Sequence, residues 1–301
     1  MEKKTIISLL IVALVLGGGG FVWVLFRGGE EGILVLNCTI PSVPGEIPNL
    51  KVENRNITAE QASAVAEEVF NLVGSVRRIE DAYLVENEAR LFVIFDQGGF
   101  LYDHGPYGGN SPSGETAKQV AGELLGKLRD NGLTPSHPSV EIENADPSID
   151  SAVRVTFPIK FENISIGEIA IDVGEGGEVV QARGDWKEVI PEENISIMTP
   201  KEELDILPEK LTQHLEEELE RYGVPGYPSI TKIIVQNIAP PTYFVTLTAP
   251  QDYLLPIYLF EFKIEWSSKH PVYDDSNLIY SVALSAIDGG YVYGTSLTGI
   301  A

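Results

Sequence analysis

A pattern of one amphipathic helix followed by antiparallel strands occurs three times along this chain. This repetition limits the folds that the chain can adopt. Apolar residues recur with helical spacing over residues 62–73, 117–128 and 199–219. Each stripe is followed by an apolar strand, an aspartate, a Gly-Gly turn and a second apolar strand. The three aspartates are Asp96, Asp172 and Asp288. The sequence therefore predicts an α+β fold of tandem modules, each with one helix packed on an antiparallel β-sheet.

Local signals mark where these helices and strands begin. Thr58 with Gln61, and Thr199 with Glu202, have the spacing of a capping box, and Pro208 is expected to restart the third helix. Further strand-like runs lie between the helices and the hairpins, at residues 153–161, 230–236 and 257–266. The predicted modules are 58–112, 113–198 and 199–301.

An uncharged run precedes the modules. Residues 6–26 read IISLLIVALVLGGGGFVWVLF, and a helix of this length spans roughly 30 Å, the thickness of a bilayer core. Lys3 and Lys4 come just before it, which favours a cytoplasmic tail over residues 1–5. The sequence thus predicts a single-pass transmembrane helix in contact with lipid, with the N-terminus cytoplasmic and the ectodomain outside the cell membrane. A cleaved signal peptide is the alternative.

The segment after the anchor is predicted to be a stalk. Residues 27–57 contain Pro41, Pro44 and Pro48 and show little periodicity, apart from a short strand at residues 33–36. Four N-x-S/T sequons fit an exterior location and predict a glycoprotein. Their asparagines are Asn37, Asn56, Asn163 and Asn194.

The charge balance excludes some partners. The chain has 44 acidic and 21 basic side chains, for a net charge of −23. A field of that sign repels phosphate backbones, so nucleic acid is not an expected partner. Cys38 is the only cysteine, so no disulfide can form within the chain.

No catalytic motif is present, and the sequence predicts a protein that is not an enzyme and holds no cofactor. The four histidines lack metal-ligand spacing, and His104 is expected to be an isolated histidine in a loop. Calcium is the best candidate ligand, because clustered carboxylates supply the oxygens it prefers. The candidate metal residues are Asp172, Glu175, Asp274 and Asp275. The alternative is that these are turn carboxylates that face water.

Tyrosines near predicted turns are candidates for contacts with a partner, since tyrosine is common at interfaces. They are Tyr102, Tyr107, Tyr291 and Tyr293. For the first two, the loop at residues 103–114 is either a binding tip or a linker between modules. For the last two, the alternative is an ordinary place in a strand.

The order helix, strand, strand, Asp-Gly turn, strand over residues 58–294 resembles the PepSY family of small extracytoplasmic domains. The layout of a short tail, one membrane helix and tandem modules is similar to that of the YycI and YycH proteins, which restrain a membrane histidine kinase. The resemblance implies a non-enzymatic, membrane-tethered regulatory protein that binds a membrane or envelope protein. The alternatives are a self-assembling structural component of the cell envelope and an inhibitor or chaperone of a secreted protease.

Overall fold

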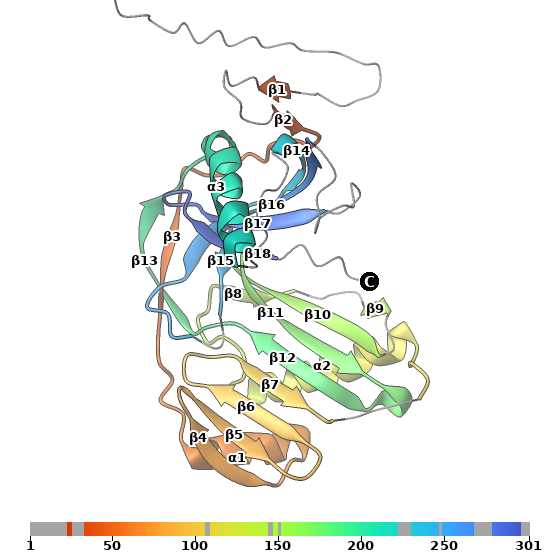
Figure 1. Cartoon of the computed structure of the whole chain (residues 1–301). Coiled ribbons are helices and arrows are strands. Elements are labelled where there is room, and N and C mark those ends of the chain that lie inside the picture. The colour runs from red at the N-terminus through yellow and green to blue at the C-terminus, as the bar shows by residue number, and fades with distance from the viewer. Residues whose placement is uncertain are drawn as a thin grey trace, which may run out of the picture. The chain divides into compact units, whose positions relative to one another are not determined.

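The computed structural model of the chain describes residues 23–25, 33–105, 109–143, 147–149, 152–221, 230–246, 249–267 and 279–295 (Figure 1). Within these residues it contains α-helices packed on sheets whose strands are almost all antiparallel. The predicted α+β class is therefore confirmed. The chain divides into two compact units. Unit 1 comprises residues 1–47, 195–242 and 256–301, and unit 2 comprises residues 48–194 and 243–255.

Unit 2 contains a nine-stranded sheet in the order β4-β5-β6-β7-β12-β11-β10-β8, with β9 paired to β10. These strands are β4 (Ser75–Ile79), β5 (Ala82–Glu86), β6 (Leu91–Phe95), β7 (Phe100–Asp103), β8 (Val140–Ile142), β9 (Pro147–Ile149), β10 (Val153–Phe161), β11 (Ile164–Val173) and β12 (Val179–Asp185). Strands β7 and β12 pair in antiparallel register from Phe100 with Gly184 to Asp103 with Gln181. The hairpins of predicted modules 58–112 and 113–198 thus lie in one continuous sheet.

Two helices pack on this sheet. Helix α1 (Ala59–Phe70) contacts β4 and β5, helix α2 (Gly114–Asp130) contacts β9, β10 and β11, and the two helices also touch each other. The buried faces follow the predicted apolar stripes, except that the first stripe ends at Phe70: Val73 lies beyond the helix and is 69 % exposed. These faces include Ala62, Ala66, Val69 and Phe70 on α1, and Ala117, Ala121, Leu124, Leu125 and Leu128 on α2.

The start of α1 has the predicted capping box. The Thr58 hydroxyl accepts a hydrogen bond from the Gln61 backbone N–H, and the Gln61 side chain accepts one from the Thr58 N–H. We expect Thr58→Ala to lower the free energy of unfolding by about 1 kcal/mol, because it leaves a backbone donor without its partner. Urea unfolding followed by circular dichroism measures the loss. Glu68→Ala, an exposed change in the same helix, is the control and should stay within about 0.5 kcal/mol of the natural chain.

Residues 243–255 complete unit 2 although they follow the rest of it by almost fifty positions. The Val52 N–H donates to the Asp252 carbonyl and the Leu254 N–H donates to the Leu50 carbonyl. The Gln97 side chain donates to the Gln251 carbonyl at 3.0 Å and accepts from the Gln251 N–H at 3.0 Å. This late segment is therefore an integral part of the unit.

Unit 1 is built around a second sheet in the order β1-β2-β14-β16-β17-β18, with β15 paired to β16. These strands are β1 (Trp23–Leu25), β2 (Ile33–Leu36), β14 (Ile230–Ile238), β15 (Thr242–Phe244), β16 (Leu255–Trp266), β17 (Tyr280–Ser285) and β18 (Tyr291–Thr295). Strand β2 pairs with β14 in parallel, and the pairs β1–β2, β14–β16, β16–β17 and β17–β18 are antiparallel. Strands β3 (Glu46–Val52) and β13 (Val189–Ser196) form a separate pair.

Helix α3 (Pro200–Arg221) packs against β14. Thr199 and Glu202 make the predicted reciprocal cap, with Glu202 Oε2 accepting from the Thr199 N–H at 2.7 Å. The helix runs through Pro208 without a restart, so that detail of the prediction is wrong. Because Pro208 stands in the ninth position, its ring kinks or weakens one turn and does not end the helix.

The predicted anchor falls mostly outside the described residues. Of residues 6–26 the structure describes Trp23–Leu25, which form β1 antiparallel to β2, and the predicted tail 1–5 is not among the described residues either. No helix in the described part of the chain is both long enough and apolar enough to cross a bilayer. In the predicted stalk, the short strand at 33–36 is present as β2, and residues 46–52 form β3. Leu34, Leu36, Ile47 and Leu50 are buried there. This stretch belongs to the folded units and is not a free linker.

Candidate functional site

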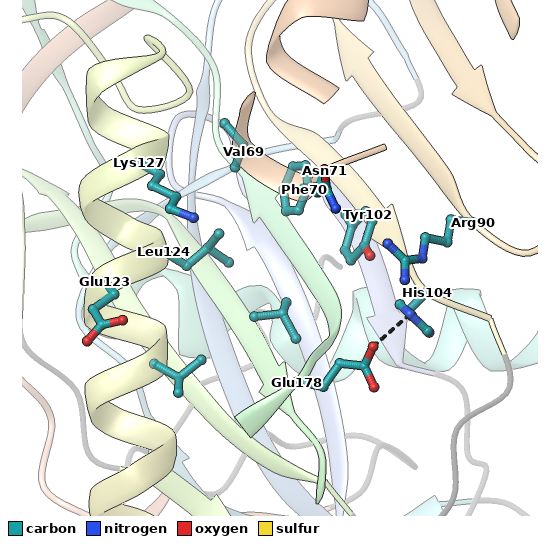
Figure 2. Close-up of a pocket in the computed structure, with 12 residues that line it drawn as sticks. Val69, Phe70, Asn71, Arg90, Tyr102, His104, Glu123, Leu124, Lys127 and Glu178 are labelled. Atoms are coloured by element: carbon teal, nitrogen blue, oxygen red, sulfur yellow. Dashed lines mark ion pairs between the residues drawn. The ribbon is translucent and has the colours of Figure 1, made fainter. Parts of the chain in front are cut away.

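A pocket of about 260 Å³ in unit 2 is the candidate site (Figure 2). It lies where the end of α1, one face of α2, the end of β7 and the start of β12 meet. Apolar side chains from the helices and β12 line it together with charged side chains from several elements. The lining residues are Val69, Phe70, Asn71, Arg90, Tyr102, His104, Val120, Glu123, Leu124, Lys127, Glu178 and Val179.

The helices position one side of the pocket. Helix α1 ends at Asn71, whose left-handed φ of 51° turns the chain away, and its N–H caps the carbonyl of Glu67 at 2.9 Å. On α2 the four lining residues follow the helical spacing i, i+3, i+4, i+7, so one face of the helix supplies them all. They are Val120, Glu123, Leu124 and Lys127.

Aromatic rings form the base beneath the end of α1. The Tyr102 ring stacks on Phe70 with centroids 4.2 Å apart, and Phe70 also packs against Phe92 at 5.2 Å. Tyr102 is 3 % exposed, and burial raises the pKa of its hydroxyl, an effect that the positive charge of Arg90 opposes. Tyr102, a predicted partner contact, therefore acts as part of a packed wall.

His104 is not the isolated loop histidine that the sequence suggests. It follows β7, and its Nε2 lies 2.9 Å from Oε1 of Glu178, which precedes β12 (Figure 2). That distance suits an ion pair when the ring is protonated, but the orientation does not make a hydrogen bond. Both ring nitrogens are buried and have no hydrogen-bond partner among the described residues. The pairing of β7 with β12 is what brings these two side chains together.

Two cations stand on either side of the pocket. Figure 2 shows Lys127 on α2 and Arg90 across from it, with Phe70 and Tyr102 between them in the view. Within the part of the chain that the structure describes, neither has a carboxylate partner within ion-pair distance. By contrast, Glu123 accepts a hydrogen bond from the Gln119 side chain at 3.1 Å.

This arrangement is suited to holding an amphipathic group. The twelve lining residues include no serine, threonine or cysteine that the His104–Glu178 pair could activate as a nucleophile. The apolar walls and the two cations instead offer burial and charge recognition.

Of the four candidate metal residues, the structure describes Asp172 and Glu175. Asp172 is buried and its two carboxylate oxygens each accept a hydrogen bond from the Arg154 guanidinium at 2.8 Å. Glu175 is exposed in a short 3₁₀ turn, η1 (Glu175–Gly177), and Asp274 and Asp275 lie outside the described residues. No group of three or more His, Cys, Asp and Glu side chains gathers as a metal-ligand set in the described part of the chain. The Arg154 pair occupies the oxygens of Asp172 that calcium would need.

The other predicted positions are placed as follows. The four sequon asparagines are all exposed, which leaves each open to modification. Tyr107 lies outside the described residues, and Tyr291 and Tyr293 belong to β18.

No known protein family matches the chain, and no curated protein matches it. A solved structure of an uncharacterized protein from Eubacterium rectale is similar at 11% sequence identity, with 89% of this chain and 92% of that chain covered and a TM-score of 0.45. A likeness at that level carries no argument about fold or function.

Proposed function

We propose that this chain is a membrane-tethered, extracytoplasmic binding and regulatory protein that acts on a membrane or envelope protein without catalysing a reaction. Residues 6–26 are its anchor, and the two α+β units form its ectodomain. The uncharged run, the exposed sequons and the net negative charge of the chain support this location.

The pocket of unit 2 is the observation that carries the binding function. It combines apolar walls with two cations that have no carboxylate partner in the described part of the chain. Such a site gains affinity from buried apolar area and specificity from a few placed polar groups. We propose that a segment of the partner enters it.

Co-purification of the full chain in mild detergent tests this proposal. We expect a stoichiometric membrane or envelope protein to accompany the natural chain, and Lys127→Glu to weaken that association on the order of tenfold, because it reverses a charge at the pocket. Arg129→Glu is the matched control: both residues stand in the last turn of α2, so both changes cost the same helix-dipole interaction, but Arg129 does not line the pocket.

Two results would count against the proposal. One is repeated isolation of a monomer without a partner. The other is a loss of association that is the same for Lys127→Glu and Arg129→Glu. Self-association that grows with the concentration of the chain would favour the structural-component alternative instead.

A further inference from the structure

We propose that the pocket of unit 2 binds the C-terminal residue of a polypeptide, taking both its free carboxylate and an apolar last side chain. This inference deepens the proposed function and rests on it, since the chain end would belong to the partner protein.

The size of the pocket sets the size of the occupant. An apolar cavity of about 150 Å³ holds a benzene molecule, and sites for drug-sized ligands begin at about 300 Å³. The pocket, at about 260 Å³, lies between these limits. It therefore accommodates one large side chain with a small polar group and is too small for a helix or a long extended segment.

The walls select an apolar side chain. Val69 at the end of α1, Val120 and Leu124 on α2, and Val179 at the start of β12 contribute aliphatic surface. Burying an aliphatic or aromatic side chain against such surface is favourable.

The free cations select a carboxylate. Acidic side chains outnumber basic ones by 44 to 21, so a basic side chain has many available partners. Four arginines form ion pairs with carboxylates: Arg77, Arg78, Arg154 and Arg183. Arg90 and Lys127 have no such partner among the described residues and both line the pocket. A guanidinium matches the two oxygens of a carboxylate, so Arg90 is the expected anchor.

The two carboxylates of the pocket limit the charge of the ligand. Glu123 and Glu178 offset Arg90 and Lys127, so the charges of these four lining side chains sum to zero. That balance accepts a single negative charge and disfavours a phosphate dianion, which the two carboxylates would repel.

The apolar walls and the cations lie close together in one small pocket. This closeness favours a chain end over an internal acidic residue as the ligand. In a C-terminal residue the carboxylate and the side chain are attached to the same carbon, so both fit one small pocket. An internal Asp or Glu has main chain on both sides, and its apolar neighbour is on a different residue.

Calorimetric titration of the full chain in detergent tests the proposal with three short peptides. The first ends in leucine with a free carboxylate, the second is the same peptide with an amidated end, and the third is amidated and carries an internal glutamate. We expect the first to bind at least about tenfold more tightly than the other two. The second peptide loses the charge-assisted hydrogen bond, and the third cannot place a carboxylate and the side chain of the same residue in the pocket. N-acetyl-leucine, which mimics the last residue alone, should bind more weakly than the first peptide but more tightly than its amide.

Substitutions of the lining cations test whether the peptide binds in this pocket. Arg90→Gln should weaken binding of the free-carboxylate peptide by about tenfold or more, and Lys127→Gln should weaken it to a smaller extent. Arg129→Gln, the exposed control on α2, should leave it unchanged. The Arg90 side chain makes no hydrogen bond within the described fold, and Lys127→Gln provides an independent test should Arg90→Gln alter folding.

Equal affinity for the free and amidated peptides would overturn the proposal, and so would equal affinity for the internal glutamate. Loss of affinity in Arg129→Gln to the same extent as in Arg90→Gln would also overturn it. These outcomes differ from a failure of the proposed function. If a membrane protein co-purifies but the free-carboxylate peptide neither binds nor displaces it, the chain-end proposal fails alone. If the peptide binds but no membrane protein co-purifies, only the proposed function fails.

Discussion

At pH 8, Glu203→Met is expected to raise the free energy of unfolding by about 3 kcal/mol. Glu203 stands on α3 and is fully buried, and neither of its carboxylate oxygens has a hydrogen-bond partner among the described residues. Burial, with smaller contributions from the negative charges of Asp288 and Glu202, raises its pKa from about 4.5 to about 7. At pH 8 the desolvated charge of Glu203 therefore lowers the free energy of unfolding, and methionine carries no such charge.

The sign of the pH dependence follows from that shift. Because the pKa of Glu203 is higher in the folded chain than in the unfolded chain, the folded chain holds this proton more tightly. Its contribution to stability is fully present below about pH 4.5, and it is lost as the pH rises through about 7. The advantage of Glu203→Met over the natural chain should therefore be small near pH 4.5 and reach its full size by pH 8.

Urea unfolding at pH 5 and pH 8 measures this difference. Asp205→Asn is the control, since it removes a carboxylate from an exposed position of the same helix. It should change stability by less than about 0.5 kcal/mol at both pH values. An advantage of Glu203→Met that is the same at pH 5 and pH 8 would show that the carboxyl does not titrate as described.

Trp186→Ala is expected to destabilise unit 2 by about 4 kcal/mol. The Trp186 side chain is fully buried, and the Arg55 guanidinium lies over its ring at 5.5 Å from the centroid. Two glycines make room for the ring: a Cβ at Gly98 would lie 2.7 Å from Cζ3, and one at Gly184 would lie 3.0 Å from Nε1. Alanine would leave a large cavity and an uncovered arginine among tightly packed neighbours.

Urea unfolding should be followed by circular dichroism, because the substitution removes a fluorophore. Tyr253→Ala, at a position that is 44 % exposed, is the control for removal of a large aromatic side chain and should cost less than about 1 kcal/mol. A loss below about 1 kcal/mol for Trp186→Ala would mean that the core around the ring collapses to fill the space.

Local features of the fold were predictable because their causes lie within a few residues of one another. The capping box of Thr58 with Gln61 and the helix it begins are present as expected. Strand β10 has the bounds that the alternating pattern at residues 153–161 predicts, and β2 occupies residues 33–36. Helical and strand periodicity and turn chemistry need no knowledge of distant partners.

The site was not predictable because distant pairing creates it. His104 and Glu178 belong to different repeats and meet because β7 pairs with β12. No spacing in the sequence signals that pairing, since either hairpin could in principle have ended its own sheet. The prediction of a stalk is wrong for the same reason. The prolines near residues 41–48 suggest a linker, but the strands that they flank are buried by segments far along the chain.

The late segment 243–255 has a consequence for how the protein is made. Unit 2 begins at residue 48, yet Leu254 and Gln251 are needed to complete its hydrogen bonds. During synthesis the nine-stranded sheet can form early, but its last pieces arrive only after residues 195–242 of unit 1 have emerged. The two units therefore mature together, and a fragment truncated near residue 198 would be an unfinished folding intermediate.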